Sequence, residues 1–208
     1  MLSILLVLLC ISSYAQMSAL EFIENKGQWN ETIQFKAKIP SGNLYLEQNE
    51  LIYQFYDEQD MARYHDLHHG FLKNPTPADY LMDVHAFRVK FLNAEFPFIT
   101  GAEATTDYEN YFIGNDKSKW ASNVKKFKKT SYQNLYPNID LKFYLKEGFL
   151  KYDFVVKKGA DVNQIQLDYV GVDGIFLEKG ELKISTSVNE IIEQKPYAYQ
   201  TINGRQKE

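Results

Sequence analysis

Apolar and polar residues alternate over two neighbouring segments of the chain, 139–145 and 150–156. A two-residue turn at Glu147-Gly148 would join them into a β-hairpin. A shift of one residue would bring every apolar side chain opposite a polar one, so the sequence specifies the pairing. The predicted pairs are Ile139 with Val156, Leu141 with Phe154, Phe143 with Tyr152, Leu145 with Leu150 and, on the polar face, Lys142 with Asp153.

Short strand-like runs with turn residues between them occupy most of the remaining chain. Such spacing is typical of β-sandwiches. We therefore expect an all-β, mostly antiparallel, β-sandwich-like fold of two packed lobes, residues 16–113 and 114–208, divided near an irregular segment at 107–116. The expected strands are 32–39, 43–47, 51–56, 84–92, 96–102, 124–127, 164–170, 174–177, 181–186 and 191–201.

One segment changes to a helical period and predicts a short helix near residues 58–69. Asp57 can cap its first turn, and Gly70 can end it. Met61, Tyr64, Leu67 and His68 recur at helical spacing, which supports this prediction.

The two ends of the chain also carry signals. Residues 2–11 are almost uninterrupted apolar sequence, and Ser13-Tyr14-Ala15 provides small residues for cleavage, so residues 1–15 read as a signal peptide. A lipid anchor at Cys10 fits less well, because Leu9 stands where a small residue is needed. We expect a secreted or cell-surface protein with no transmembrane segment, since the apolar run is too short to span a bilayer.

The carboxyl end holds Asn203-Gly204, a strong hairpin signal, with only four residues after it. The expected return strand is missing from this pattern. We therefore expect the carboxyl-terminal lobe to be truncated relative to a longer parent protein.

Composition limits the chemistry. Cys10 is the only cysteine and would leave with the signal peptide, which excludes thiol catalysis and disulfides from the mature chain. The net charge of −4 argues against nucleic acid as a partner. The 15 Tyr and 14 Phe suit half-exposed sheet faces, with an aromatic sugar-binding platform as the less favoured alternative. No cofactor is expected.

Two groups of residues could bind metal ions. His65, His68 and His69 share the predicted helix and could be joined in space by His85 and Asp83, and imidazoles with a carboxylate suit zinc. Histidines in a last helical turn also favour the helix dipole, and we prefer that interpretation. A calcium site could use oxygen ligands from residues that equally form turns: Asp107, Asn110, Asn115 and Asp116.

A basic run surrounds two aromatic residues, a pattern that could bind nucleic acid or an acidic polysaccharide. Lysines on an edge strand also prevent sheet-to-sheet aggregation, and we favour that role. Its ligand-binding candidates are Trp120, Lys125, Lys126, Lys128 and Lys129, beside Lys117, Lys119 and Phe127. No nucleophile elbow or phosphate loop is present, so no catalytic residue is assigned. A hydrolase is kept as a third alternative, because a glycosidase needs only two carboxylates that meet in space.

Several strings in order resemble a known family: FIENKGQW at 22–29, NYFIGND at 110–116 with Trp120, LYPNIDL at 135–141, LKYDFVV at 150–156 with Gly159-Ala-Asp161, and PYAYQ at 196–200. They resemble the uncharacterised amino-terminal domain of large secreted proteins from Bacteroidota-type bacteria. There it precedes SBBP β-propeller repeats, Ig-like modules of the polycystic-kidney-disease type and a gliding-motility-associated sorting domain.

The resemblance implies an extracellular β module exported by the type IX route, and it carries over no catalytic residue. We expect a non-enzymatic module, the amino-terminal scaffold of a larger secreted adhesin-like protein. Its expected partners are other modules of that protein, surface partners or a glycan. The alternative is a carbohydrate- or partner-binding domain.

Overall fold

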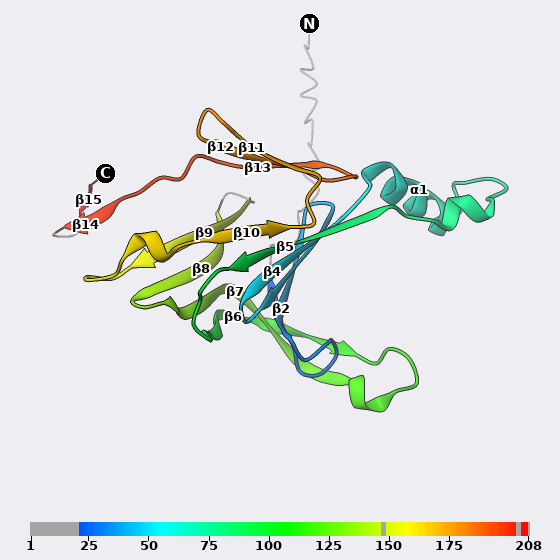
Figure 1. Ribbon diagram of the computed structural model, residues 1–208. Helices are drawn as coiled ribbons and strands as arrows, with labels where there is room; N and C mark the ends of the chain where they lie inside the picture. Colours follow the sequence, from blue (N-terminus) through cyan, green and yellow to red (C-terminus); the bar gives the residue numbers. More distant parts are fainter. Residues whose placement is uncertain (1–20, 147–148, 203–204, 208) are drawn as a thin grey trace, which may run out of the picture.

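Antiparallel strands form most of the molecule, and the computed structural model describes residues 21–146, 149–202 and 205–207 (Figure 1). One large sheet has ten strands, and most of them come from the alternating apolar runs. They are β1 (Phe22–Glu24), β2 (Ile33–Ile39), β3 (Gly42–Glu47), β4 (Glu50–Tyr56), β5 (Val84–Phe91), β6 (Phe98–Tyr111), β7 (Ala121–Tyr136), β8 (Ile139–Lys146), β9 (Phe149–Val156) and β10 (Leu167–Val170).

The large sheet curls because two parts of β7 pair with different strands. The order is β10-β5-β4-β3-β2-β1-β7-β8-β9, with β6 along the other side of β7. The first half of β7 pairs with β1 at Phe127, and the second half pairs with β8 at Thr130. This long strand therefore passes from one layer of a sandwich-like fold to the other. The strands at the two ends of the order, β9 and β10, leave one side of the sandwich without backbone pairing.

A second, three-stranded sheet lies over that side (Figure 1). It consists of β11 (Gly174–Glu178), β12 (Glu181–Ser185) and β13 (Glu190–Glu193). Ile184 of β12 is 1% exposed and belongs to the main core, so the small sheet is packed onto the large one. We call it the covering sheet. A hairpin of β14 (Gln200–Ile202) and β15 (Arg205–Lys207) ends the described chain.

One hydrophobic core joins the layers. Buried side chains from β1 to β5 meet those of β7, β8 and β12. Alternate residues are buried where one face of a strand lies on this core, as in β5 at Phe87, Val89 and Phe91. The core includes Phe22, Leu44, Leu46, Phe87, Tyr132, Tyr136, Leu141 and Phe143. A smaller cluster of Ile23, Ala121 and Val124 packs beside Trp29 and Tyr111.

The predicted hairpin is confirmed in its register. β8 and β9 pair as expected, from Ile139 opposite Val156 to Leu145 opposite Leu150, with Lys142 opposite Asp153. The turn at Glu147-Gly148 lies outside the described residues.

The helix is confirmed as α1 (Glu58–His68), and Asp57 accepts hydrogen bonds from the backbone of Gln59 and Asp60. None of the residues of α1 is buried, so the helix does not contribute to the core. Instead, α1 and the short 3₁₀ helix η1 (Pro77–Tyr80) form an arm that extends from the body (Figure 1). Arg63 holds this arm together by contacting Asp60 at 2.6 Å and the carbonyl of Leu81 at 3.1 Å.

Several boundaries differ from the expectation. The ranges 16–113 and 114–208 both contribute strands to the large sheet, as in the pairing of β5 with β10, and both contribute side chains to the main core. The boundary near 113 therefore does not separate two hydrophobic cores. β6 continues into the expected irregular segment as far as Tyr111, with two register shifts in its pairing with β7. The predicted strand 191–201 is divided into β13 and β14.

The chain ends give mixed outcomes. The return strand expected to be missing exists as β15, which pairs with β14 from Arg205 opposite Ile202. That prediction was wrong because three residues suffice for a short return strand. The proposed signal peptide, residues 1–15, lies outside the described residues. No described helix is long and apolar enough to cross a membrane.

Candidate functional site

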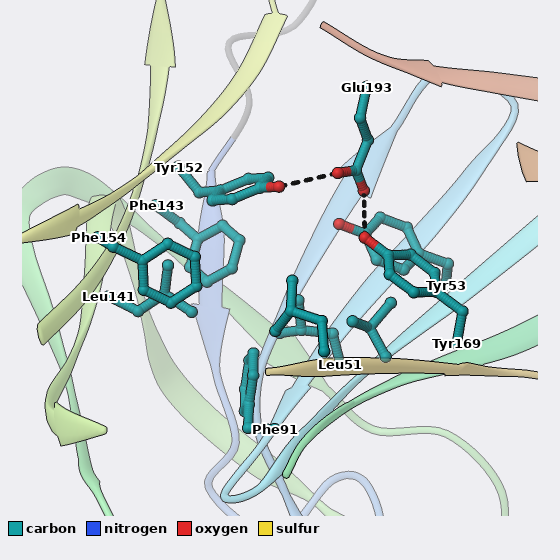
Figure 2. Close-up of a pocket in the computed structure, with 11 residues that line it drawn as sticks. Leu51, Tyr53, Phe91, Leu141, Phe143, Tyr152, Phe154, Tyr169 and Glu193 are labelled. Carbon is teal, nitrogen blue, oxygen red and sulfur yellow. Dashed lines mark hydrogen bonds between the residues drawn. The ribbon is translucent and has the colours of Figure 1, made fainter. Parts of the chain in front are cut away.

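A carboxylate and two tyrosine hydroxyls meet where the sandwich lacks backbone pairing (Figure 2). Glu193 of β13 accepts hydrogen bonds from Tyr152 of β9 at 2.8 Å and from Tyr169 of β10 at 3.0 Å. One residue of the covering sheet therefore connects the two edges of the large sheet that do not pair with each other. We call these three residues the Glu193 cluster.

Strand register explains why Glu193 points inward. It lies opposite Leu182, and the neighbouring pair Ile184–Ile191 shares its face, because residues two apart in a strand lie on the same side. Ile184 is buried in the core, so this face of the covering sheet is the one that packs. Glu193 thus occupies a position where an apolar residue would be expected.

Apolar surroundings keep the hydroxyls protonated. The space around the cluster is lined mainly by Leu51, Tyr53, Val89, Phe91, Leu141, Phe143, Phe154 and Leu167. Burial raises the pKa of Tyr169 and Tyr152 far above the ordinary value, and the nearby charge of Glu193 acts in the same direction. Neutral hydroxyls can donate to the carboxylate, and hydrogen bonds to a charged acceptor are stronger than neutral ones.

The space beside the cluster is too small for a ligand. Its volume is about 10 Å³, and a single water needs at least about 10–15 Å³. A general base must reach a substrate proton at hydrogen-bond distance. The carboxylate here already accepts two hydroxyl donors and faces packed side chains, so the arrangement connects strands and leaves no room for a reaction.

Alkaline pH is expected to destabilise the protein through its buried tyrosines. Tyr132 is 0% exposed and donates to the carbonyl of Glu47, and burial raises its pKa well above the ordinary value. A raised pKa in the folded state contributes stability below the unfolded-state pKa of about 10, and that stability is lost as pH rises further. Urea unfolding measured between neutral pH and pH 11 should show a decline that begins near pH 10. Tyr132→Phe should make the decline shallower, and an unchanged slope would contradict this origin.

His85 of β5 connects the large sheet to one end of the covering sheet, where the segment before β11 lies beside the turn between β12 and β13. Its Nε2 lies 2.7 Å from the carbonyl of Gly171, which precedes β11, and its Nδ1 lies 2.9 Å from the hydroxyl of Ser187, between β12 and β13. The backbone N–H of Ser187 also donates to Nδ1 at 3.2 Å. These contacts require a neutral ring with the proton on Nε2. His85 therefore has a structural role, separate from the helix histidines.

Replacing His85 by alanine should loosen the covering sheet without unfolding the large one. The change removes the side-chain contacts to Gly171 and Ser187, which we expect to cost about 1–2 kcal/mol of local stability. Limited proteolysis should then cut the loop at 186–189 several-fold faster. His69→Ala is the matched control, since His69 is exposed and lies at the end of α1. Equal cleavage rates in both variants would contradict the assigned role.

The other histidine candidates stay on the arm. His68 donates from Nδ1 to the carbonyl of Tyr64 at 2.9 Å, and the rings of His65 and His69 lie 4.3 Å apart. The interactions of His85 are with the covering sheet, so the structure does not unite the four histidines. Within the described residues, no three His, Cys, Asp or Glu side chains form a group that could hold a metal ion.

The lysine run does not lie on an edge strand, and that prediction was wrong. β7 has neighbours on both sides, because β1 and β8 approach from residues distant in sequence. Lys126 is 9% exposed and forms ion pairs with Asp107 and, at 2.6 Å, with Glu21. The hydrogen bonds to Asp107 and Glu21 raise the pKa of Lys126 to about 12. Lys129 pairs with Glu103.

The remaining lysine candidates face outward. The side chains of Lys125 and Lys128 are exposed, and the backbone N–H of Lys125 donates to Glu24. The run therefore combines an internal ion pair at Lys126 with a solvated face.

Trp120 lies near the end of the long β6–β7 hairpin, which extends from the body (Figure 1). Its indole N–H donates to the carbonyl of Gly114 at 3.2 Å, and its ring meets Phe112 edge to face at 5.6 Å. Lys117 places its amine 5.7 Å from the Trp120 ring centre. Phe112 is 59% and Ile113 77% exposed, so this end presents apolar rings beside a cation. We call these residues the hairpin tip.

Three of the four calcium candidates, Asp107, Asn110 and Asp116, have partners within the protein. Asp107 pairs with Lys126, and Asn110 accepts the backbone N–H of Asn123. Asp116 caps the 3₁₀ helix η2 (Lys117–Lys119) by accepting from Ser118. These are the turn-forming and strand-joining roles that Asn and Asp commonly take.

A polar hollow of about 300 Å³ lies at one end of the sandwich. Amide and carboxyl groups dominate its lining, which consists of Asn93, Glu95, Pro137, Asp161, Asn163, Gln164 and Gln166. Asp161 accepts from the backbone and side chain of Asn163. The hollow has room for a polar ligand but offers no aromatic ring for stacking.

Sequence reasoning missed the Glu193 cluster. Tyr152 was placed correctly on the apolar face of its hairpin, but its partner Glu193 is 41 residues away. The available signal was Glu193 itself, two residues after Ile191. A strand that packs on a core would carry an apolar residue at this position.

Comparison with known proteins gives one match. The family model described as a domain of unknown function, DUF7948, matches residues 22–208. No curated protein and no solved structure matches the chain. The match begins at β1 and extends over the covering sheet and the last hairpin, so the chain belongs to the DUF7948 family.

Proposed function

We propose that this protein is a non-enzymatic extracellular or cell-surface module, the amino-terminal scaffold of a larger secreted, adhesin-like protein. The Glu193 cluster is the observation that carries this proposal. Glu193 and the two tyrosines whose pKa it helps to raise connect strands across a space of about 10 Å³. One water requires about 10–15 Å³. A framework role explains this arrangement without any substrate.

The surface supports contact with partners. The arm formed by α1 and η1 exposes Phe71, Tyr80 and Leu81 at 69%, 59% and 69%, and the hairpin tip adds further apolar rings. Exposed apolar residues that gather on a protein mark interaction surfaces. Other modules of the same parent protein or surface partners are the proposed occupants.

The proposed setting follows from the resemblance stated for the motifs. It places the domain before SBBP repeats, Ig-like modules and a type IX sorting domain in a Bacteroidota-type bacterium, after export by a signal peptide at residues 1–15. The apolar run at 2–11 supports export.

Export is tested by expressing the full chain and a variant lacking residues 2–15 in a bacterium with two membranes. The full chain should leave the cytoplasm and lose about 15 residues, as mass spectrometry of its amino terminus would show. The shortened variant should stay inside. A full-length chain that remains uncleaved in the cytoplasm would contradict the proposed location.

Carbohydrate binding is the second candidate, and the hairpin tip favours it. Trp120 and Phe112 offer aromatic surface, and Lys117 adds a cation that could meet an acidic sugar. Against it, the two rings meet at an interplanar angle of 74°, which is not the flat platform that sugars stack on.

A glycan array with the purified secreted protein distinguishes the two functions. The scaffold proposal predicts no retained glycan. A glycan that is retained by the wild type and by Tyr80→Ala, but lost in Trp120→Ala, would replace the scaffold proposal with carbohydrate binding at the hairpin tip. Tyr80 is a suitable control because it is an exposed aromatic residue on the arm formed by α1 and η1, away from the hairpin tip.

A further inference from the structure

The outer edge of the covering sheet is an unpaired strand with exposed apolar side chains. β11 pairs with β12 alone among the strands that the structure describes. Ile175, Phe176 and Leu177 are 42%, 61% and 77% exposed. An exposed apolar edge of this kind is a template for pairing with another strand.

Both faces of this edge are apolar. Ile175 and Leu177 share the face on which Ile184 is buried, and Phe176 lies on the opposite face. Natural edge strands are commonly protected by lysine, proline or a bulge. The ladder of the edge strand β6 is interrupted by two register shifts, whereas the ladder between β11 and β12 is regular.

Backbone geometry leaves donors and acceptors on the open side. Lys179 and Gly180 both have positive φ, 53° and 89°, as a two-residue type I′ turn requires. In such a hairpin the pair that flanks the turn is hydrogen-bonded, and bonding alternates along the strand. Glu178 flanks this turn, so Ile175 and Leu177 direct their N–H and C=O groups outward.

We propose that β11 pairs with β11 of a second copy of this chain, antiparallel and centred on Phe176. Ile175 of one copy then lies opposite Leu177 of the other, and their outward backbone groups can bond in both halves of the ladder. Phe176 of one copy lies opposite Phe176 of the other, at a pair without backbone hydrogen bonds, where the two side chains are close together. The two covering sheets become one continuous six-stranded sheet.

Charge complementarity selects this occupant and this register. Asp173 and Lys179 lie three residues either side of Phe176, and both are exposed. Asp173 precedes β11 and Lys179 follows it, so antiparallel pairing about Phe176 brings Asp173 of each copy beside Lys179 of the other at the two ends of the paired strands. Centring the pairing on Ile175 or Leu177 instead would place a charged residue opposite an apolar one. Opposite charges across a strand pair stabilise it, and like charges destabilise it.

The test exchanges the charges at residues 173 and 179 and measures dimer formation. Sedimentation velocity is recorded over a concentration series of the purified full chain. The wild type should form a dimer. Asp173→Lys and Lys179→Asp should each lower the dimer affinity at least tenfold, because each creates two like-charge pairs. An equimolar mixture of the two variants should form a heterodimer, since every facing pair is again of opposite sign.

The controls separate pairing from folding and from net charge. Lys158→Asp changes the charge as Lys179→Asp does, at an exposed site in the loop after β9, and should dimerise like the wild type. Asp tolerates positive φ well, so Lys179→Asp should keep the turn. The proposal is overturned if the wild type is monomeric at every concentration. Single variants that dimerise as the wild type does, or a mixture that stays monomeric, would overturn it equally.

Discussion

Replacing Glu193 by alanine should lower the free energy of unfolding by about 2 kcal/mol. The change leaves the hydroxyls of Tyr152 and Tyr169 without their acceptor. Each lost hydrogen bond to a charged acceptor costs about 1.5–3 kcal/mol when the groups stay desolvated. Tyr152 is 36% exposed, so water can partly replace the acceptor there and reduces the total. Urea unfolding followed by tyrosine and tryptophan fluorescence measures the change.

Glu190→Ala is the matched control for this variant. It removes the same side chain from the same strand, but Glu190 is exposed, and such surface changes usually stay within about 0.5 kcal/mol. Glu193→Gln should fall between the two, because its amide can still accept from one tyrosine. An equal, small effect of both alanine variants would show that the Glu193 cluster does not connect β9 with β10.

Gly42→Ala should destabilise the protein by about 3 kcal/mol or more. A Cβ on Gly42 would lie 2.0 Å from the carbonyl oxygen of Gln54 and 3.2 Å from the Cα of Phe55. Both atoms belong to the backbone of β4, and Gly42 pairs with Phe55 in the ladder between β3 and β4. No side chain can turn to make room, so the ladder itself must shift. Thermal and urea unfolding should both report the loss.

Gly114→Ala isolates the steric part of that effect. Nothing lies within 4 Å of a Cβ at Gly114, and its φ is +72°. The alanine variant should therefore lose only the roughly 1–2 kcal/mol that a left-handed backbone costs a residue with a side chain. If Gly42→Ala were no more harmful than Gly114→Ala, the close approach of β3 to β4 would not hold in solution.

Features set by neighbouring residues could be predicted from the sequence. The register of β8 with β9 follows from alternation on either side of one turn, and the capping of α1 by Asp57 follows from a single local residue. Both were right because their partners lie within a few residues along the chain. The period of α1 was right for the same reason.

Features set by distant partners could not be predicted. The exposed face of α1 depends on what the rest of the chain brings to it, which the helical period does not encode. The lysine run was predicted to lie on an edge strand, but β1 and Glu21 approach β7 at Lys126 from about a hundred residues away along the chain. Glu193 and Tyr169 meet only because the covering sheet folds back over the sandwich. The one local indication was that Glu193 lies two residues after Ile191, on the strand face that otherwise carries apolar residues.

The framework interpretation depends on the covering sheet being a permanent wall of the sandwich. Ile184 in the core, the Glu193 cluster and the contacts of His85 all join it to the large sheet. A mobile sheet would instead open the apolar space behind Glu193 to ligands. The role of the covering sheet therefore separates a scaffold from a gated binding protein.

Native-state hydrogen exchange of the wild-type protein tests this claim most directly. Amides of β12, which pairs on both sides, should exchange only through the same global unfolding as those of β8 in the centre of the core. Equal opening free energies for the two strands are the predicted result. Exchange in β11–β13 that is several orders of magnitude faster than in β8 would contradict the account and show that the covering sheet opens on its own.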